Sequence, residues 1–174
     1  MDYWIRQVLE VAMTFPADGY HLSVGEGDSW WFLDVRYDVK IVAEQTGGAL
    51  TFMEFVAPAG FGPPRHLHVS EDEAFYVIEG AMRVVCGSKT WDASAGSLVF
   101  LPRSIEHAFI VTGDTPLRGL QLTNPSGFED FVAEIGRRPE GLGLPTPEMP
   151  DIQRLDEAGR RSGRITLGPP MTLD

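Results

Sequence analysis

The segment HLHVSEDEAFYVIEG, residues 66–80, carries the strongest structural signal in this chain. His66 and His68 stand two residues apart, and a short polar stretch separates them from Glu73. An apolar run follows and ends at Gly80. Val, Phe, Tyr and Ile around a polar stretch predict two strands joined by a turn.

Side chains two residues apart on a strand share a face and lie about 7 Å apart along it. His66 and His68 can therefore point the same way, and Glu73, Phe75 and Val77 share one face of the second strand. If both strands line one barrel, the carboxylate can meet the two imidazoles. Two histidines and a carboxylate suit Fe, Mn, Co, Ni, Cu or Zn. A His-x-His pair alone more often binds no metal, so further ligands are needed to support this interpretation.

A fourth candidate ligand lies in GSLVFLPRSIEHAFIV, residues 96–111. Gly96 opens a strand, Pro102 ends it, and His107 begins the next strand. Phe109 lies on the same face as His107. Because this histidine is far from the first pair in the sequence, only closure of a barrel could bring the three together.

Short runs rich in Val, Phe, Tyr, Ile and Thr extend the strand pattern from residue 30 to about residue 123. They read WWFLDVRYDVKIVAE, ALTFMEFVA, EAFYVIE, AMRVVC, SLVFLP, HAFIVT and PLRGLQLT. No helical pattern separates the runs, so strand–helix–strand units and a parallel sheet are not expected. Many short strands at this spacing predict an all-β sandwich, jelly roll or barrel.

Helical periodicity flanks the strands on both sides. Residues 2–14 predict a short amphipathic helix or a loosely attached extension. Apolar residues at i, i+3, i+4 and i+7 predict a helix over residues 128–135 that stops at Gly136. A second helix is expected to start near Asp151 and to end at Gly163.

These patterns divide the chain into three parts. We expect an N-terminal extension at residues 1–29, a β-barrel at residues 30–125 and a helical segment at residues 126–174. The helical segment is too small to hold a core of its own, so it is expected to lie against the barrel.

Composition excludes several classes of partner. The 174 residues carry a formal net charge of -11, which argues against nucleic acid or an anionic membrane, since both require a basic face. The single cysteine, Cys86, permits no internal disulfide and no cysteine-rich zinc site. No apolar run is long enough to span a membrane or to form a signal peptide. A cytoplasmic protein is expected.

The histidine-containing segments resemble the two motifs of the cupin superfamily. The first motif has Gly, five residues, His-x-His, three or four residues, Glu, six residues and Gly. Gly60, His66, His68, Glu73 and Gly80 match it with every gap correct.

The second cupin motif has Gly, five residues, Pro-x-Gly, two residues, His, three residues and Asn. Gly96, Pro102 and His107 match it. Ser104 stands where Gly is usual and Val111 where Asn is usual, and neither departure removes a ligand.

The resemblance implies a double-stranded β-helix, the jelly-roll barrel of cupins. Residues 46–80, together with NPSGFEDFVAEIG at residues 124–136, are similar to bacterial single-domain cupins related to quercetin 2,3-dioxygenase. In these proteins a helical C-terminal segment follows one barrel. Cupin barrels often pair through their sheets, so a homodimer is expected, with outward residues such as Tyr76 and Ile78 contributing.

The resemblance also implies one divalent transition metal per chain, held by His66, His68, Glu73 and His107. The metal would stabilise the anion of an enol or phenol, and Glu73 could accept the proton as a general base. The small-molecule substrate would then react with dioxygen.

The expected cavity neighbours Phe75, Val77 and Phe109 would make the site apolar, which suits a flat aromatic substrate. Ordinary core packing is the competing interpretation of these three side chains.

Three functions stay open at this point, because cupins carry many activities. The first is a dioxygenase acting on a flavonol-like or other enol or phenol. The second is an isomerase or cyclase that uses the metal as a Lewis acid. The third is a non-catalytic cupin that binds a small molecule.

Overall fold

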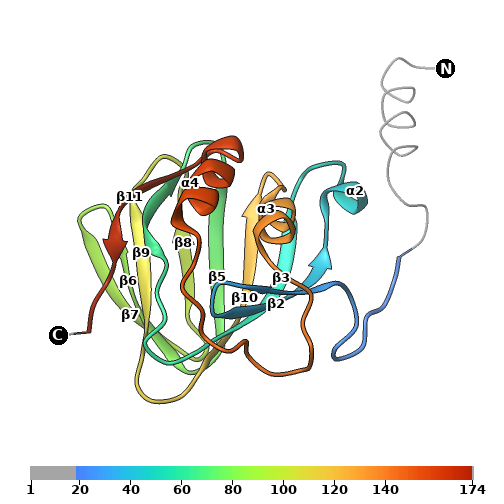
Figure 1. The fold of residues 1–174 in the computed structure, drawn as a ribbon, viewed down its shortest axis with the longest axis horizontal. Coiled ribbons are helices and arrows are strands. Elements are labelled where there is room, and N and C mark those ends of the chain that lie inside the picture. Colours follow the sequence, from blue (N-terminus) through green and yellow to red (C-terminus); the bar gives the residue numbers. More distant parts are fainter. Residues whose placement is uncertain (1–18, 174) are drawn as a thin grey trace.

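The computed structural model describes residues 19–173, and its elements are mostly β-strands (Figure 1). The predicted helix at residues 2–14 lies outside the described residues. In chain order the elements are β1 (Ser29–Phe32), β2 (Val35–Ile41), α2 (Ala43–Thr46), β3 (Thr51–Ala57), β4 (Pro64–His68), β5 (Asp72–Glu79), β6 (Ala81–Cys86), β7 (Lys89–Ser94), β8 (Leu98–Leu101), β9 (His107–Thr112), β10 (Leu117–Asn124), α3 (Phe128–Ile135), α4 (Ile152–Arg161) and β11 (Arg164–Pro170).

The strands form two antiparallel sheets that face each other. One sheet has six strands in the order β1-β2-β3-β10-β5-β8, and the other has five in the order β11-β4-β9-β6-β7. Strands distant in the chain are neighbours in both sheets, as β3 and β10 are, so the chain crosses repeatedly between the sheets. This arrangement confirms the predicted all-β jelly roll.

Buried and partly buried residues alternate along the strands, and the buried ones form the core between the sheets. In β3 every second residue is buried, beginning with Thr51, and β10 alternates in the same way beside it. The inward side chains of β3 include Met53 and Phe55, which are almost fully buried. The outward side chains of the same strand are only partly buried, so one sheet face supplies the core and the other faces away from it.

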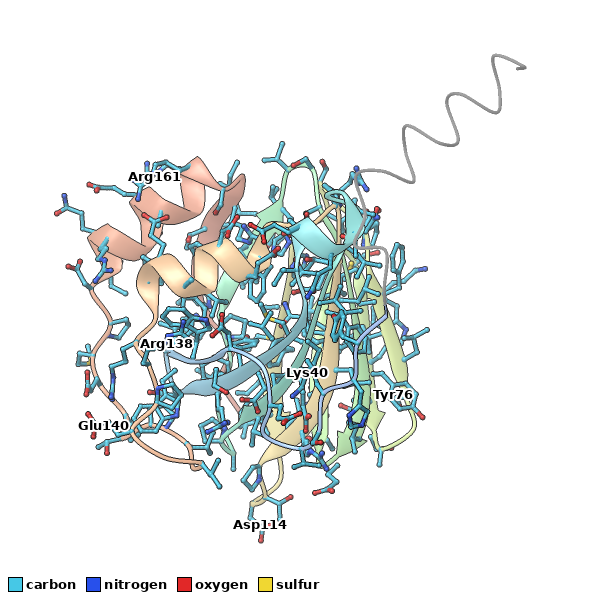
Figure 2. All side chains as sticks on the ribbon, turned by 90° about the vertical axis from the view of Figure 1, so that its right-hand side faces the viewer. Lys40, Tyr76, Asp114, Arg138, Glu140 and Arg161 are labelled. Atoms are coloured by element: carbon cyan, nitrogen blue, oxygen red, sulfur yellow. The ribbon has the colours of Figure 1, made fainter. Side chains whose placement is uncertain are left out.

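Helices α3 and α4 lie together on one side of the two sheets (Figures 1 and 2). Phe128, Phe131 and Val132 of α3 and Ala158 of α4 join the same core as the barrel residues. The Asp151 side chain accepts a hydrogen bond from the backbone N–H of Arg154 at 3.0 Å and caps the start of α4.

Both C-terminal helices were expected from the sequence and are confirmed, α3 at its predicted bounds and α4 after Asp151. Within residues 19–173, no helix is long and apolar enough to cross a membrane.

Two strands were not expected from the sequence. Residues 126–174 were predicted as a helical segment whose second helix ends at Gly163, and no strand was expected after it, but residues 164–170 form β11, which pairs with β4. The prolines and the glycine of RITLGPP disfavour a strand, yet they are tolerated at an edge, where only one side must be paired. β7 is the opposite edge of this sheet, and its polar, exposed sequence lacks a buried-strand pattern.

Candidate metal centre

Three histidines from two neighbouring strands form a compact cluster between the sheets. In the pairing of β4 with β9, His66 lies directly opposite His107. His68 is two residues further along β4, so its side chain shares the inward face. One ring nitrogen of each histidine lies within 4.8 Å of those of the other two. Barrel closure thus brings the predicted downstream histidine beside the first pair.

Two of the rings are held by backbone carbonyls. His66 Nδ1 is 2.7 Å from the carbonyl oxygen of Pro64, and His107 Nδ1 is 2.9 Å from that of Ile105. A carbonyl only accepts hydrogen bonds, so each Nδ1 carries the proton and donates it. The lone pair of each ring is therefore on Nε2, which is the atom left for a metal.

The third ring, that of His68, is 1% exposed and has a carboxylate neighbour. Its Nδ1 lies 2.9 Å from Oε2 of Glu71, although the ring N–H does not point straight at that oxygen. Among the described residues, both ring nitrogens of His68 and Nε2 of His107 are buried and have no hydrogen-bond partner. Two buried nitrogens with free lone pairs are costly unless something binds them, so these residues fit a metal ion.

The protonation state of the cluster also fits metal binding. Burial, followed by the neighbouring His107 and His68, lowers the pKa of His66 to about 3. Burial likewise lowers the pKa of His107, against the attraction of the Glu73 carboxylate. At neutral pH both rings are therefore uncharged and can donate a lone pair without first losing a proton.

Glu73 approaches the cluster from the opposite sheet, on β5. Its Oε2 lies 3.5 Å from Nε2 of His107, and its Oε1 accepts a hydrogen bond of 2.6 Å from the amide of Gln121. The side chain is 4% exposed. All four residues predicted from the sequence are thus near one another, the histidines as a tight group and Glu73 beside them.

A cavity of about 90 Å³ opens beside the cluster. Most of its lining is apolar, and its polar lining residues include His66, His68 and Glu73. Of the three predicted cavity neighbours, Phe75 and Phe109 line it, with ring centroids 5.4 Å apart. Val77 does not: it lies two residues further along β5 from Phe75, fully buried in the core.

The C-terminal elements supply lining residues that the sequence did not indicate. Phe128 and Phe131 of α3, Leu155 and Gly159 of α4 and Arg164 of β11 all line the cavity. The two phenylalanines lay on a predicted apolar helix face, but nothing in the sequence placed that face over the cavity.

Tyr37 of β2 is a further polar lining residue that sequence reasoning missed. Three aromatic rings surround it, with centroids 5.7 to 6.2 Å away. Burial, and next the negative charge of Glu73, raise the pKa of its phenol well above the usual range. The hydroxyl therefore stays protonated and can donate a hydrogen bond.

Comparison with known proteins agrees with the fold and the motifs. A family model described as a cupin domain matches residues 52–122. Quercetin 2,3-dioxygenase of Bacillus subtilis (strain 168) is 25% identical over 138 residues, which is 79% of this chain and 40% of that protein. The chain therefore spans less than half of the length of this relative.

Solved structures are similar at the level of the fold. A protein from Thermotoga maritima described as a predicted oxalate decarboxylase has a TM-score of 0.57 at 19% identity, covering 61% of this chain and 99% of that one. A sugar phosphate isomerase of the cupin superfamily from Silicibacter pomeroyi has a TM-score of 0.52 at 17% identity, covering 60% and 75%. The two facing sheets and the histidine cluster of this chain agree with the match of residues 52–122 to the cupin domain.

Proposed function

We propose that this protein is a metal-dependent cupin enzyme, a dioxygenase that acts on a flavonol-like or other enol or phenol. The observation that carries the proposal is the position of the histidine cluster, which borders an apolar cavity lined by aromatic rings. Ligand sites of this kind combine an apolar wall, which binds a ring, with a few polar groups, which orient it.

The residues that would hold the metal are His66, His68, His107 and Glu73. The histidines offer buried, uncharged nitrogens, and Glu73 adds one negative charge beside them. A divalent transition metal bound there would stabilise the anion of an enol or phenol and, if redox-active, permit its reaction with dioxygen. Fe, Mn, Ni, Co, Cu and Zn all suit this ligand set.

The chain itself would bind the substrate and move its proton. The aromatic lining would hold a flat ring and exclude water from the cluster. Glu73 would accept the hydroxyl proton of the substrate, and the amide of Gln121 holds the other carboxylate oxygen in place. Tyr37 would donate a hydrogen bond to a substrate oxygen from the same cavity.

Oxygen consumption tests the proposed reaction. The similarity to a quercetin 2,3-dioxygenase makes quercetin the first substrate to try. Protein loaded in turn with Fe, Mn, Co, Ni or Cu should consume oxygen when quercetin or a related enol is added. Fully loaded protein that takes up no oxygen across a broad panel of phenols and enols would contradict the proposal.

A second candidate function is an isomerase or cyclase that uses the metal as a Lewis acid. The observation that favours it is the presence of a carboxylate, Glu73, and a protonated phenol, Tyr37, in one cavity. Such a base and acid suit a proton shift within one substrate. Turnover under strict exclusion of oxygen would select this function, and tight binding without turnover would select a non-catalytic cupin.

We also propose that the protein is a homodimer. The outward face of β5 and β8 exposes Tyr76, Leu98 and Phe100, and Tyr76 pairs with Leu98 across the two strands. Figure 2 shows Tyr76 on the side of the sheets away from α3 and α4. An exposed apolar sheet face of this kind is a common site of protein association.

A further inference from the structure

The three histidines differ in what holds their Nδ1 atoms. His66 and His107 each use the backbone carbonyl two residues earlier in the chain, at Pro64 within β4 and at Ile105 just before β9. His68 instead has the carboxylate of Glu71 beside its Nδ1, at 2.9 Å. An anionic partner makes an imidazole a stronger electron donor than a neutral carbonyl does, so His68 has a distinct environment in the cluster.

Glu71 lies in the turn between β4 and β5 but is 7% exposed. A buried carboxylate is costly unless charged or hydrogen-bonding groups surround it. Its Oε2 accepts a hydrogen bond from Nη2 of Arg164, and it lies 2.9 Å from Nδ1 of His68, close enough for a small turn of the ring to complete a second one. The same oxygen therefore joins a candidate metal ligand to a residue from the C-terminal strand.

Arg164 is the first residue of β11, and it lies directly opposite His68 in the pairing of β11 with β4. Its guanidinium lies over the rings of Phe128 and Phe131, 4.9 and 5.0 Å from their centroids. Its Nη1 donates to the carbonyl oxygen of Ser162 at 3.2 Å. These contacts, with 7% exposure, hold the guanidinium in one place and bring α3 and β11 against Glu71.

We propose that Glu71 and Arg164 are positioning residues for the metal ligand His68, and that the C-terminal strand is thereby part of the metal centre. Glu71 keeps the proton of His68 on Nδ1, which leaves Nε2 free to bind the metal. Arg164 neutralises Glu71 and keeps its carboxylate turned toward His68. The inference rests on the proposed metal site, because it assigns a role toward one of its ligands.

Metal affinity tests the inference, measured by competition of Co²⁺ or Zn²⁺ with a chromophoric chelator. Glu71→Gln keeps the shape of the side chain and removes its charge, so the dissociation constant should rise about 10-fold or more. Arg164→Met should also raise it. If Arg164 acts through Glu71, the double variant should bind metal no more weakly than Glu71→Gln alone.

A matched control comes from another arginine–glutamate pair in the C-terminal segment. Arg161 on α4 contacts Glu134 on α3, and it points outward at the surface (Figure 2). Arg161→Met should leave metal affinity unchanged. A loss of affinity in this variant equal to that of Arg164→Met would mean that any loosening of the segment weakens the site, and it would overturn the specific role of Arg164.

A second readout needs no metal. The ¹⁵N shifts of the His68 ring in metal-free protein report which nitrogen carries the proton. The wild type should show the proton on Nδ1, and Glu71→Leu combined with Arg164→Met, which removes both buried charges together, should move it to Nε2. A folded double variant with the proton still on Nδ1 would overturn the inference.

The outcomes separate this inference from the proposed function. If the wild type binds no metal, both fail. If the wild type binds metal and Glu71→Gln binds it equally well, only the role of Glu71 and Arg164 fails, and the metal site stands.

Discussion

His66 and His107 face each other across the β4–β9 pair, with ring centroids 4.5 Å apart at an angle of 68°. They belong to different sequence motifs, and strand pairing alone fixes their separation. Each ring is oriented by the backbone carbonyl two residues before it, at Pro64 or Ile105. The backbone therefore builds two thirds of the cluster before any metal binds, which is the kind of preorganisation that favours tight binding.

Replacement of His66 or His68 by Ala should abolish stoichiometric metal in the purified protein, because either change leaves only two of the clustered nitrogens. Elemental analysis of protein expressed in metal-supplemented medium measures this. His21→Ala is the matched control, since His21 is exposed and apart from the cluster, and it should keep the metal. Unchanged metal content in both cluster variants would refute the site.

The metal-free protein should lose stability as the pH falls below about 6.5. His66 has a pKa of about 3 in the folded chain and an ordinary value near 6.5 when unfolded, so the unfolded chain binds the extra proton between these values. Between pH 6.5 and pH 3, a histidine whose pKa is lowered in this way reduces the free energy of unfolding by up to about 1.4 kcal/mol for each pH unit that the pH falls. Urea unfolding at pH 7, 6 and 5 measures the slope.

His66→Gln should reduce this slope, because glutamine does not titrate. The lowered pKa of His107 adds to the effect in the wild type and remains in the variant. If the free energy of unfolding depends on pH equally steeply in the wild type and in His66→Gln, the loss of stability at low pH is not caused by His66.

Most of the barrel and all four proposed ligands could be predicted from the sequence, because strand alternation and motif spacing are local signals. Ser104 is informative: the cupin motif has Gly there, and the structure holds this serine at φ 63°, where glycine has no steric cost. Its backbone N–H donates to the carbonyl oxygen of His68 at 2.6 Å. The turn geometry of the motif is therefore kept although the residue differs.

Tyr37 and Arg164 could not be predicted as site residues. Tyr37 lies in a strand that gave an ordinary core pattern, and only the packing of the two sheets shows that it lines the cavity. Arg164 lies in a Pro- and Gly-containing segment whose pairing with β4 is a long-range contact. No local pattern in a single sequence records such contacts, because they depend on how the C-terminal segment folds back over the barrel.

Glu73→Gln should separate the two roles proposed for this carboxylate. The amide keeps the size of the side chain but cannot accept the substrate proton, so turnover should fall about 100-fold to 10,000-fold at equal metal content. Loss of a ligand charge should also weaken metal binding, which chelator competition measures separately. Full turnover at full metal content would contradict the role as a base, whatever happens to the affinity for the metal.

Light scattering should report a mass close to twice 19.2 kDa. Leu98→Glu with Phe100→Glu places two charges on the exposed face of β8 and should give a monomer. Trp91→Glu is the control, because Trp91 is also exposed and apolar but lies on β7 in the other sheet. A monomeric wild type would refute the proposed dimer, and a monomeric Trp91→Glu would place the interface elsewhere.

Tyr37→Phe should affect activity and stability differently. The change removes one hydroxyl and keeps the ring that packs against Phe32, Phe55 and Phe128. Within residues 19–173 that hydroxyl has no hydrogen-bond partner, so the free energy of unfolding should stay the same or rise by up to about 1 kcal/mol. Substrate binding should weaken by about 2- to 10-fold if the hydroxyl donates to the substrate.

Comparison of urea unfolding with the kinetics of the same variant checks this prediction. Because burial and Glu73 raise the pKa of Tyr37, the wild-type hydroxyl remains a donor in alkaline solution, and the difference between the two proteins should persist to about pH 10. Unchanged kinetics would show that the hydroxyl does not contact the substrate. A large loss of stability would show instead that it has a structural role in the barrel.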